Sequence, residues 1–253
     1  MKISNLIWKV GLFTCCTVAL AAGENEWKSF ENADGNQSFT ARVVSYDAKR
    51  DSATMIMKKG GQRISVALSR LKEADQAYVK EQAQILAANS SFRFKFDKFM
   101  EETASNRIGD TTTTTYHGGY RVAVSNYSSV NVEDVEVEDL VIWRKDSFEG
   151  MGDDQFVTGS HQISTIFAGS NDHFTTAGIQ MQGVVKKGSS STSGGACPTC
   201  PTSTVTTRTL RSRDQLVGCI VRIRIAGKVV RTEANNAAVL KKYQDRFPSV
   251  AED

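Results

Sequence analysis

The sequence predicts a mainly β protein, in which a small barrel and a linker helix precede an antiparallel β-sandwich with a C-terminal helix. Two observations lead to this fold class. Short segments with strand-like alternation recur along most of the chain, separated by polar turns. Helical periodicity is found in two segments, about 71–89 and 236–247. The 253 residues, 40% of them hydrophobic, suffice for one large domain or two small ones.

Residues 1–22 are typical of a secretory signal peptide. Lys2 and Lys9 carry positive charge, an apolar run of 11 residues spans Val10 to Leu20, and small residues follow as cleavage sites. The run is shorter than the roughly 20 residues that cross a bilayer, so no integral membrane anchor is expected. The expected localisation is exported, either periplasmic or extracellular.

Cys15 and Cys16 leave a lipoprotein as an alternative, although Phe13 and Thr14 do not fit a lipobox. Removal of residues 1–22 takes away two lysines, so 31 − 2 = 29 basic residues face 28 acidic ones, a net charge of about +1. A nearly neutral chain lacks the basic field that binds nucleic acid, and no nucleic-acid partner is expected.

The segment 24–90 is predicted to be a small barrel followed by a helix. Strands are expected at Ser38–Tyr46, Ala53–Lys58 and Arg63–Leu68. The last two are joined by Gly60 and Gly61, which accept the positive φ angles of a tight hairpin. The helix that follows has its apolar side chains on one stripe: Leu71, Ala74, Tyr78, Ile85 and Leu86.

The stretch from "EWKSFENADGNQSFTARVV" to "ISVALSRLKEADQAYV" resembles a known family over about residues 26–82. It resembles the SHD-one domain, the first homology domain of the Sla endocytic adaptor, which also occurs in exported bacterial proteins. Lys72 departs from the family, which usually has a serine-like helix cap there. The matching residues are Trp27, Asp34, Gly35, Phe39, Ala41, Ile64, Val66, Leu68, Leu71, Asp75, Tyr78 and Val79.

The resemblance implies an SH3-like barrel that binds a peptide, since the adaptor domain binds a signal containing Asn-Pro-Phe and an acidic residue. For this chain it suggests a shallow groove with a basic rim, for which Lys58, Lys59 and Arg63 are the local candidates. The alternative is that these cations only solvate a hairpin. Trp27 is expected to anchor the core.

The segment 91–253 is predicted to be a β-sandwich. Phe92, Phe94 and Phe96 alternate with charged residues, and the threonine run 111–115 favours a strand because threonine is β-branched. Six or more strand-like segments without a long helix between them indicate an antiparallel sandwich, immunoglobulin-like only in a generic way. The final helix carries a docking stripe of Val239, Leu240, Tyr243 and Phe247.

No catalytic residue, metal site or cofactor is predicted. His117, His161 and His173 lie 44 and 12 residues apart, which matches no compact zinc motif. The chain has no nucleophile elbow, P-loop or dinucleotide fingerprint. A run of acidic residues is predicted to be a solvated strand face, with a cation-binding edge as the alternative: Glu133, Asp134, Glu136, Glu138 and Asp139.

Three cysteines remain after processing: Cys197, Cys200 and Cys219. The first two form a Cys-x-x-Cys pair within a Gly/Ser/Thr/Cys insert at 186–207. No βαβ pattern surrounds the pair, so the context of a thioredoxin-type centre is missing. The favoured prediction is a local disulfide between Cys197 and Cys200, with Cys219 buried in its strand. Alternatives are a bridge from Cys219 to one of the pair, or a redox or metal role.

The sequence thus favours an exported, non-enzymatic binding or envelope-organising protein with a peptide or protein ligand. A first alternative is an extracytoplasmic thiol-disulfide or metal-binding protein that uses Cys197 and Cys200. A second alternative is a glycan-binding sandwich, which exposed aromatic residues on the sandwich would favour. The sequence does not determine the oligomeric state.

Overall fold

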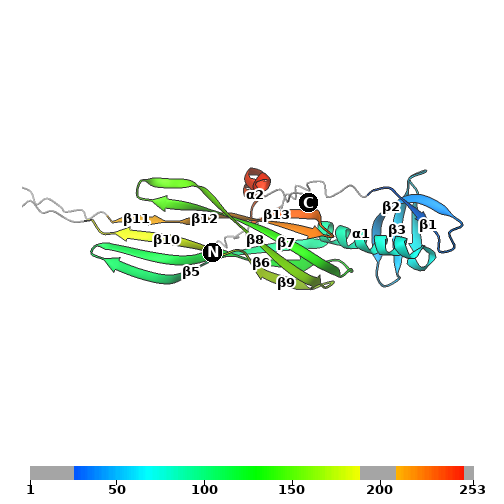
Figure 1. Cartoon of the computed structure of the whole chain (residues 1–253), viewed down its shortest axis with the longest axis horizontal. Helices are drawn as coiled ribbons and strands as arrows, with labels where there is room; N and C mark the ends of the chain where they lie inside the picture. Colours follow the sequence, from blue (N-terminus) through cyan, green and yellow to red (C-terminus); the bar gives the residue numbers. More distant parts are fainter. Residues whose placement is uncertain (1–25, 189–208, 248–253) are drawn as a thin grey trace, which may run out of the picture.

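The computed structural model describes residues 26–188 and 209–247. The predicted signal peptide and the pair Cys197 and Cys200 lie outside the described residues. The described chain is elongated, with a small sheet at one end, a long two-layered β region at the other, and helix α1 between them (Figure 1). The prediction of a mainly β fold with antiparallel sheets and a C-terminal helix is confirmed.

The small sheet has four antiparallel strands in the order β1-β2-β3-β4 and curls into a half-barrel. The hairpin between its last two strands turns at Gly60 and Gly61, whose φ angles are +82° and +64°. These are left-handed conformations that glycine adopts without a Cβ clash, as the sequence predicted. The strands are β1 (Lys28–Glu31), β2 (Ser38–Asp47), β3 (Ser52–Met57) and β4 (Arg63–Ala67), and the short helix η1 (Leu68–Arg70) follows.

Helix α1 (Glu73–Ser91) covers the concave face of this sheet. Its buried face differs from the predicted stripe, because Ala74 is exposed and Leu71 is buried ahead of the helix. The buried positions recur at three- and four-residue intervals, as one face of a helix requires. The core of the small sheet consists of Phe30, Ala41, Val43, Ala53, Met55, Leu68, Leu71 and Val79.

The β-sandwich has two antiparallel sheets. The first has the order β11-β10-β6-β5, with β9 also paired to β6, and the second has the order β13-β12-β7-β8. Their bounds are β5 (Phe92–Ile108), β6 (Thr111–Asn126), β7 (Val132–Ser147), β8 (Gly150–Ile166), β9 (Asn171–Thr175), β10 (Ile179–Lys186), β11 (Leu210–Arg213), β12 (Gln215–Ile225) and β13 (Lys228–Ala234).

Strand β5 continues well beyond the alternating aromatic residues at 92–96. The polar stretch from Glu101 to Ile108 continues the strand, and its residues from Ala104 onward pair with the threonine run of β6, with Ile108 opposite Thr111. The predicted strand character of the threonine run is confirmed. Polar side chains are tolerated here because this end of the first sheet is largely exposed.

The sandwich core lies between the two sheets. Phe92 is fully buried, and Phe94 and Phe96 pack against the core, as their alternation predicted. Its fully buried members include Val122 and Val124 from the first sheet and Val135, Val137, Val141, Val221 and Ile223 from the second. This core and the core of the small sheet are separate clusters.

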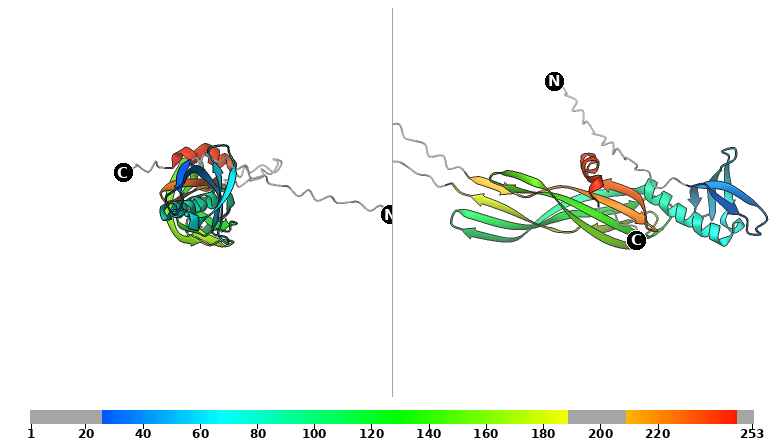
Figure 2. Two further views of the ribbon diagram at one scale, coloured as in Figure 1. Left: turned by 90° about the vertical axis from the view of Figure 1, so that its right-hand side faces the viewer. Right: turned by 45° about the horizontal axis from the view of Figure 1, so that its top comes forward.

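Helix α2 (Ala237–Tyr243) packs on the outer face of the second sheet, and the short helix η2 (Gln244–Arg246) extends it (Figure 2). The side chain of Asn236 caps α2 by accepting a 2.9 Å hydrogen bond from the backbone N–H of Val239. Val239 lies over Gly218, where a Cβ would be 2.5 Å from the valine side chain. The predicted docking stripe Val239, Leu240, Tyr243 and Phe247 is buried as expected.

Helix α1 is also attached to the sandwich. The Gln84 side chain accepts a 3.0 Å hydrogen bond from the backbone N–H of Glu133 on β7, and Lys228 lies 3.6 Å from Glu81. The guanidinium of Arg231 donates to the carbonyl oxygen of Asn89 near the end of α1. Among the described residues no helix has the length and apolar content needed to cross a bilayer.

Candidate functional site

The three predicted binding residues lie on the β3–β4 hairpin. Lys58 follows β3, Lys59 is in the turn, and Arg63 begins β4. All three are exposed, and none of their side chains forms a hydrogen bond or ion pair with another described residue. The hairpin therefore presents three cations with no acidic partner in the described part of the chain.

Strand register places Arg63 in a row that crosses the whole small sheet. Arg63 pairs with Ile56, and Ile56 pairs with Arg42. Because Lys28 pairs with Ala41, Trp27 lies next to Arg42, and the guanidinium is 5.3 Å from the centre of the indole ring. A cation and an aromatic ring at this distance attract each other. The row Trp27, Arg42, Ile56 and Arg63, called the Trp27 row below, lies on the sheet face opposite α1.

Trp27 does not anchor the core as predicted, because 43% of its surface is exposed. The reason is strand parity. Phe30 is fully buried on the inner face, and successive residues of a strand point to opposite faces, so a residue three positions earlier points outward. This parity was the signal in the sequence that identifies Trp27 as a surface residue.

The acidic residues of the four strands are already paired. Glu31 binds Lys72, and the Asp47 carboxylate lies 3.7 Å from the Arg50 guanidinium and accepts backbone N–H groups of its own turn. The Lys72 side chain forms the ion pair with Glu31 and does not cap α1. The outer face keeps a local excess of positive charge in a nearly neutral chain.

The inner face is held in place by contacts to the first turns of α1. Lys28 lies 3.2 Å from the Asp75 carboxylate and 4.2 Å from the centre of the Tyr78 ring. Asp75 also accepts a 2.8 Å hydrogen bond from the backbone N–H of Glu31. Burial raises the pKa of Tyr78, so its hydroxyl stays neutral. These contacts fix β1, and with it the position of Trp27.

In the sandwich, the predicted acidic strand face is wrong at two residues, Asp139 and Glu138. Asp139 is fully buried between the two sheets, in line with Val137 and Val141. Its Oδ1 atom lies 3.0 Å from Nε2 of His161, and Oδ2 accepts a 3.3 Å hydrogen bond from the backbone N–H of Ala177. Burial raises the pKa of Asp139, and the hydrogen bonds from Ala177 and His161 oppose that rise.

An Asp–His pair can serve acid–base catalysis when it activates a reachable nucleophile. One cysteine lies nearby in the same sheet: Cys219 pairs with Val141 on β7 and has a free, fully buried thiol. Burial raises the pKa of that thiol and keeps it in the protonated, unreactive form. The Asp139 carboxylate links the two sheets through its hydrogen bond from the backbone N–H of Ala177, which precedes β10.

Glu138 also departs from the predicted solvated face. It lies 3.0 Å from Arg224 and 3.6 Å from Arg222, and all three side chains are mostly buried. The Arg222 guanidinium is 4.1 Å from the centre of the Phe247 ring. These contacts connect the outer face of the second sheet to the segment after α2.

The other histidines are not brought together with His161 in a metal site. No group of three or more potential ligands (His, Cys, Asp or Glu) able to hold a metal occurs within 26–188 and 209–247. His117 packs against Phe99, with ring centres 5.9 Å apart, and His173 is exposed on β9. Cys197 and Cys200 lie outside the described residues, so their disulfide, redox and metal roles stay predictions.

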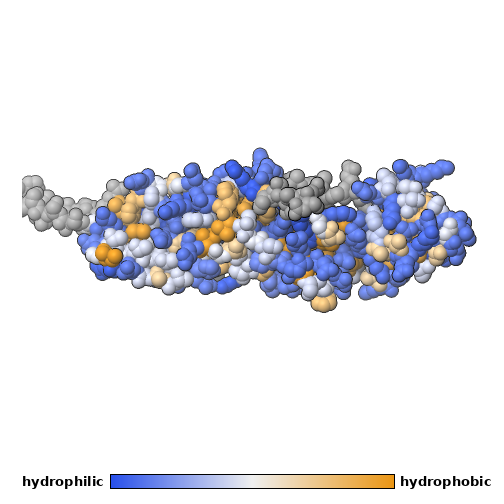
Figure 3. Space-filling view, in the orientation of Figure 1, coloured by the Kyte–Doolittle hydropathy of each residue, from blue (hydrophilic) through white to orange (hydrophobic). Residues whose placement is uncertain are grey.

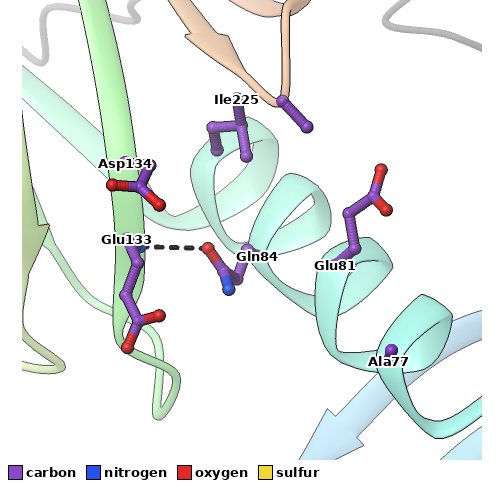
Figure 4. Close-up of a pocket in the computed structure, with 7 residues that line it drawn as sticks. Ala77, Glu81, Gln84, Glu133, Asp134 and Ile225 are labelled. Atoms are coloured by element: carbon purple, nitrogen blue, oxygen red, sulfur yellow. Dashed lines mark hydrogen bonds between the residues drawn. The ribbon is translucent and has the colours of Figure 1, made fainter.

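A cavity of about 240 Å³ lies where α1 meets the sandwich (Figure 4). Two of its residues, Asp134 and Ala226, have left-handed φ angles of +51° and +49°. The cavity is smaller than most ligand pockets, which are roughly 300–1,000 Å³. Its position between Gln84 and the Glu133 backbone identifies it as part of the joint between α1 and β7. It is lined by Ala77, Glu81, Gln84, Glu133, Asp134, Ile225 and Ala226.

Most of the surface seen in Figure 3 is hydrophilic, and apolar residues gather only in small patches.

Comparison with models of known protein families, with curated proteins and with solved structures finds no match to this chain.

Proposed function

We propose that this chain is an exported, non-enzymatic binding protein whose small sheet binds an acidic peptide or an acidic segment of a protein partner. The observation that carries the proposal is the Trp27 row, in which an exposed indole and two arginines flank Ile56 on an open sheet face. The export part of the proposal rests on the signal-peptide pattern of residues 1–22.

The chemistry of the row suits an extended ligand with carboxylates. Arg42 and Arg63 offer planar guanidinium groups that can each donate two hydrogen bonds to one carboxylate. The apolar side chain of Ile56 lies between the two arginines, and the indole of Trp27 lies beside Arg42. An open strand surface contacts a peptide along its length and does not enclose a small molecule. This combination agrees with the peptide class that the SHD-one resemblance implies.

Binding at this surface is expected to be weak and sensitive to salt. An exposed ion pair contributes about 0.2–1 kcal/mol, so affinity must come from several contacts together. At about 0.1 M ionic strength, screening acts over about 10 Å, so added salt weakens each of these contacts. The cations Lys58 and Lys59 extend the positive surface beyond the row.

The test uses residues 23–253 and a fluorescein-labelled peptide that contains Asn-Pro-Phe followed by aspartate. We expect saturable binding by fluorescence anisotropy, and loss of it when the aspartate of the peptide is replaced by asparagine. The double variant Arg42→Ala/Arg63→Ala is expected to bind at least about tenfold more weakly, which corresponds to ~1.4 kcal/mol.

The control variant Lys49→Ala/Arg50→Ala also removes two exposed cations, but from the β2–β3 turn. It is expected to bind the peptide as the unchanged protein does. Equal weakening by both double variants would show a non-specific charge effect and contradict the proposal. Absence of binding to this peptide and to glutamate-rich peptides would contradict it as well.

A further inference from the structure

Two aromatic side chains of the sandwich are more exposed than any other described aromatic residue. Tyr127 has 74% of its surface exposed and Phe167 has 60%. Tyr127 lies in the turn between β6 and β7, and Phe167 lies in the turn between β8 and β9. No described side chain covers either ring, and no ring contact or hydrogen bond of either side chain occurs within the described residues.

The two turns are joined by Asn126, which is 1% exposed. Its side-chain nitrogen donates to the carbonyl oxygens of Val130 in the first turn and Ile166 before the second, at 2.9 and 3.1 Å. Its backbone N–H donates to the carbonyl oxygen of Ser170, and its own carbonyl accepts from the N–H of Gly169.

A second asparagine completes the connection. The Asn131 side chain accepts a 3.0 Å hydrogen bond from the backbone N–H of Ala168. The Ser128 hydroxyl is held as well, because it donates to the side-chain oxygen of Asn126 at 2.7 Å. The two turns therefore form one preorganised surface, and a ligand that binds there does not have to order a flexible loop.

The chemistry of this surface is neutral. The two turns read "YSSVN" (127–131) and "FAGSN" (167–171), without a charged residue, although charged residues make up 23% of the chain. Hydroxyl and amide side chains stand beside the rings. The first charged residues after the two turns, Glu133 and Asp172, are both acidic and would repel an anionic ligand.

We propose that the surface formed by turns 127–131 and 167–171 binds a neutral polysaccharide. An aromatic ring gives the apolar C–H face of a sugar a flat contact, while serine and asparagine side chains exchange hydrogen bonds with its hydroxyl groups. The lack of lysine and arginine within the two turns argues against an anionic membrane or an acidic polymer. The aliphatic side chains of the two turns are limited to half-buried Val130 and the single methyl group of Ala168, which argues against a hydrophobic protein interface.

This inference does not depend on the proposed peptide binding, because the surface lies on the sandwich and the Trp27 row lies on the small sheet. The test is affinity gel electrophoresis of residues 23–253 in gels that contain soluble hydroxyethyl cellulose, xylan, β-glucan, mannan or starch. We expect at least one of these neutral polysaccharides to slow migration. Carboxymethyl cellulose serves as the anionic comparison and is expected to have no effect.

The variant Tyr127→Ala/Phe167→Ala is expected to lose the retardation, with the apparent affinity reduced at least about tenfold. Phe148→Ala is the matched control, since it removes a 44% exposed aromatic from the β7–β8 hairpin, and it is expected to keep the retardation. Circular dichroism and urea denaturation establish that each variant is folded.

Several results would overturn the proposal. They are the absence of retardation in all neutral gels, retardation only by the anionic polymer, and equal retardation of the double variant and the unchanged protein. Sedimentation velocity tests the competing occupant. If the unchanged protein forms a dimer that the double variant cannot form, the surface binds a second copy of the chain and the glycan assignment is wrong.

Discussion

His161 and Asp139 form a pair across neighbouring strands, with Nε2 of the histidine 3.0 Å from Oδ1 of the fully buried carboxylate. The second carboxylate oxygen accepts the backbone N–H of Ala177, which precedes β10 of the opposite sheet. One side chain thus joins three segments and links the two layers of the sandwich. Hydrophobic packing alone does not set the relative position of two sheets as specifically as a directional hydrogen bond does.

Asp139→Ala is expected to lower the free energy of unfolding by roughly 1–3 kcal/mol, because the Ala177 N–H loses its acceptor inside the protein. Asp139→Asn keeps an oxygen for that N–H and is expected to lose less. Urea denaturation of both variants at neutral pH measures the difference. A larger loss for the asparagine variant would contradict this role of the Ala177 contact.

The stability of the sandwich should also depend on pH through Asp139. Burial raises the pKa of this carboxyl above its ordinary value of 3.8, so the folded state holds the proton more tightly than the unfolded state does. Its contribution favours folding below pH 3.8 and is lost as the pH rises through the folded pKa.

The measurement compares Asp139→Asn with the unchanged protein by urea denaturation in steps from about pH 3.5 to 7. Because asparagine does not titrate, the difference in unfolding free energy should shift in favour of the variant as the pH rises. A difference that stays constant over this range, or shifts the other way, would show that the pKa of Asp139 is not raised.

Gly159 makes room for the Asp139 carboxylate. The two residues pair across β7 and β8, and a Cβ on Gly159 would lie 2.5 Å from Oδ1 of Asp139. Gly159→Ala is therefore expected to cost about 1–3 kcal/mol by overpacking. The cost should fall in the Asp139→Ala background, since the carboxylate is then absent, and a double-mutant cycle measures this coupling. Additive costs would contradict the contact.

The sequence predicted those parts of the fold that depend on local patterns. The alternation of Phe92, Phe94 and Phe96, the turn at Gly60 and Gly61, and the stripe of the last helix each follow from the geometry of a strand, a turn or a helix. These patterns determine which face is buried without any knowledge of the neighbouring element.

The residues that were missed depend on contacts between distant segments. Asp139 directly follows Glu138, and two neighbours in a strand cannot both face solvent on one side. Parity thus indicated that one of the two acids points to the other face. No local sequence pattern showed that His161 and Ala177 would form hydrogen bonds with that acid. The exposed position of Trp27 likewise follows from parity, whereas its contact with Arg42 requires the register of β1 and β2.

Helix α2 should lose part of its attachment in acid. Hydrogen bonds from Tyr243, Arg144 and Lys242, of which the Tyr243 bond has the largest effect, lower the pKa of Asp154 to about 2. A carboxyl with a lowered folded pKa stabilises the fold above pH 3.8, and this contribution is lost as the pH falls from 3.8 towards 2.

Tyr243→Phe is expected to reduce the unfolding free energy at pH 7 by about 0.5–1.5 kcal/mol, because one hydrogen bond to the carboxylate is removed. It should also weaken the loss of stability between pH 4 and 2, measured by urea denaturation in steps of about half a pH unit. Tyr127→Phe removes a hydroxyl from an exposed turn and serves as the control. The attachment would be refuted if Tyr243→Phe behaved like the control at both ends of this range.

The thiol of Cys219 should be unreactive until the protein unfolds. It is fully buried, and burial raises its pKa, so little thiolate forms near neutral pH and reagents cannot reach the sulfur. With the predicted disulfide between Cys197 and Cys200, residues 23–253 should show no reactive thiol by Ellman's reagent in the native state and one in urea. After mild reduction two thiols should react in the native state, and the variant Cys219→Ala should change only the count in urea.

A thiol that reacts in native, unreduced protein and disappears in Cys219→Ala would contradict the burial of Cys219. If unreduced protein has two reactive thiols besides Cys219, the pair Cys197 and Cys200 is not bridged.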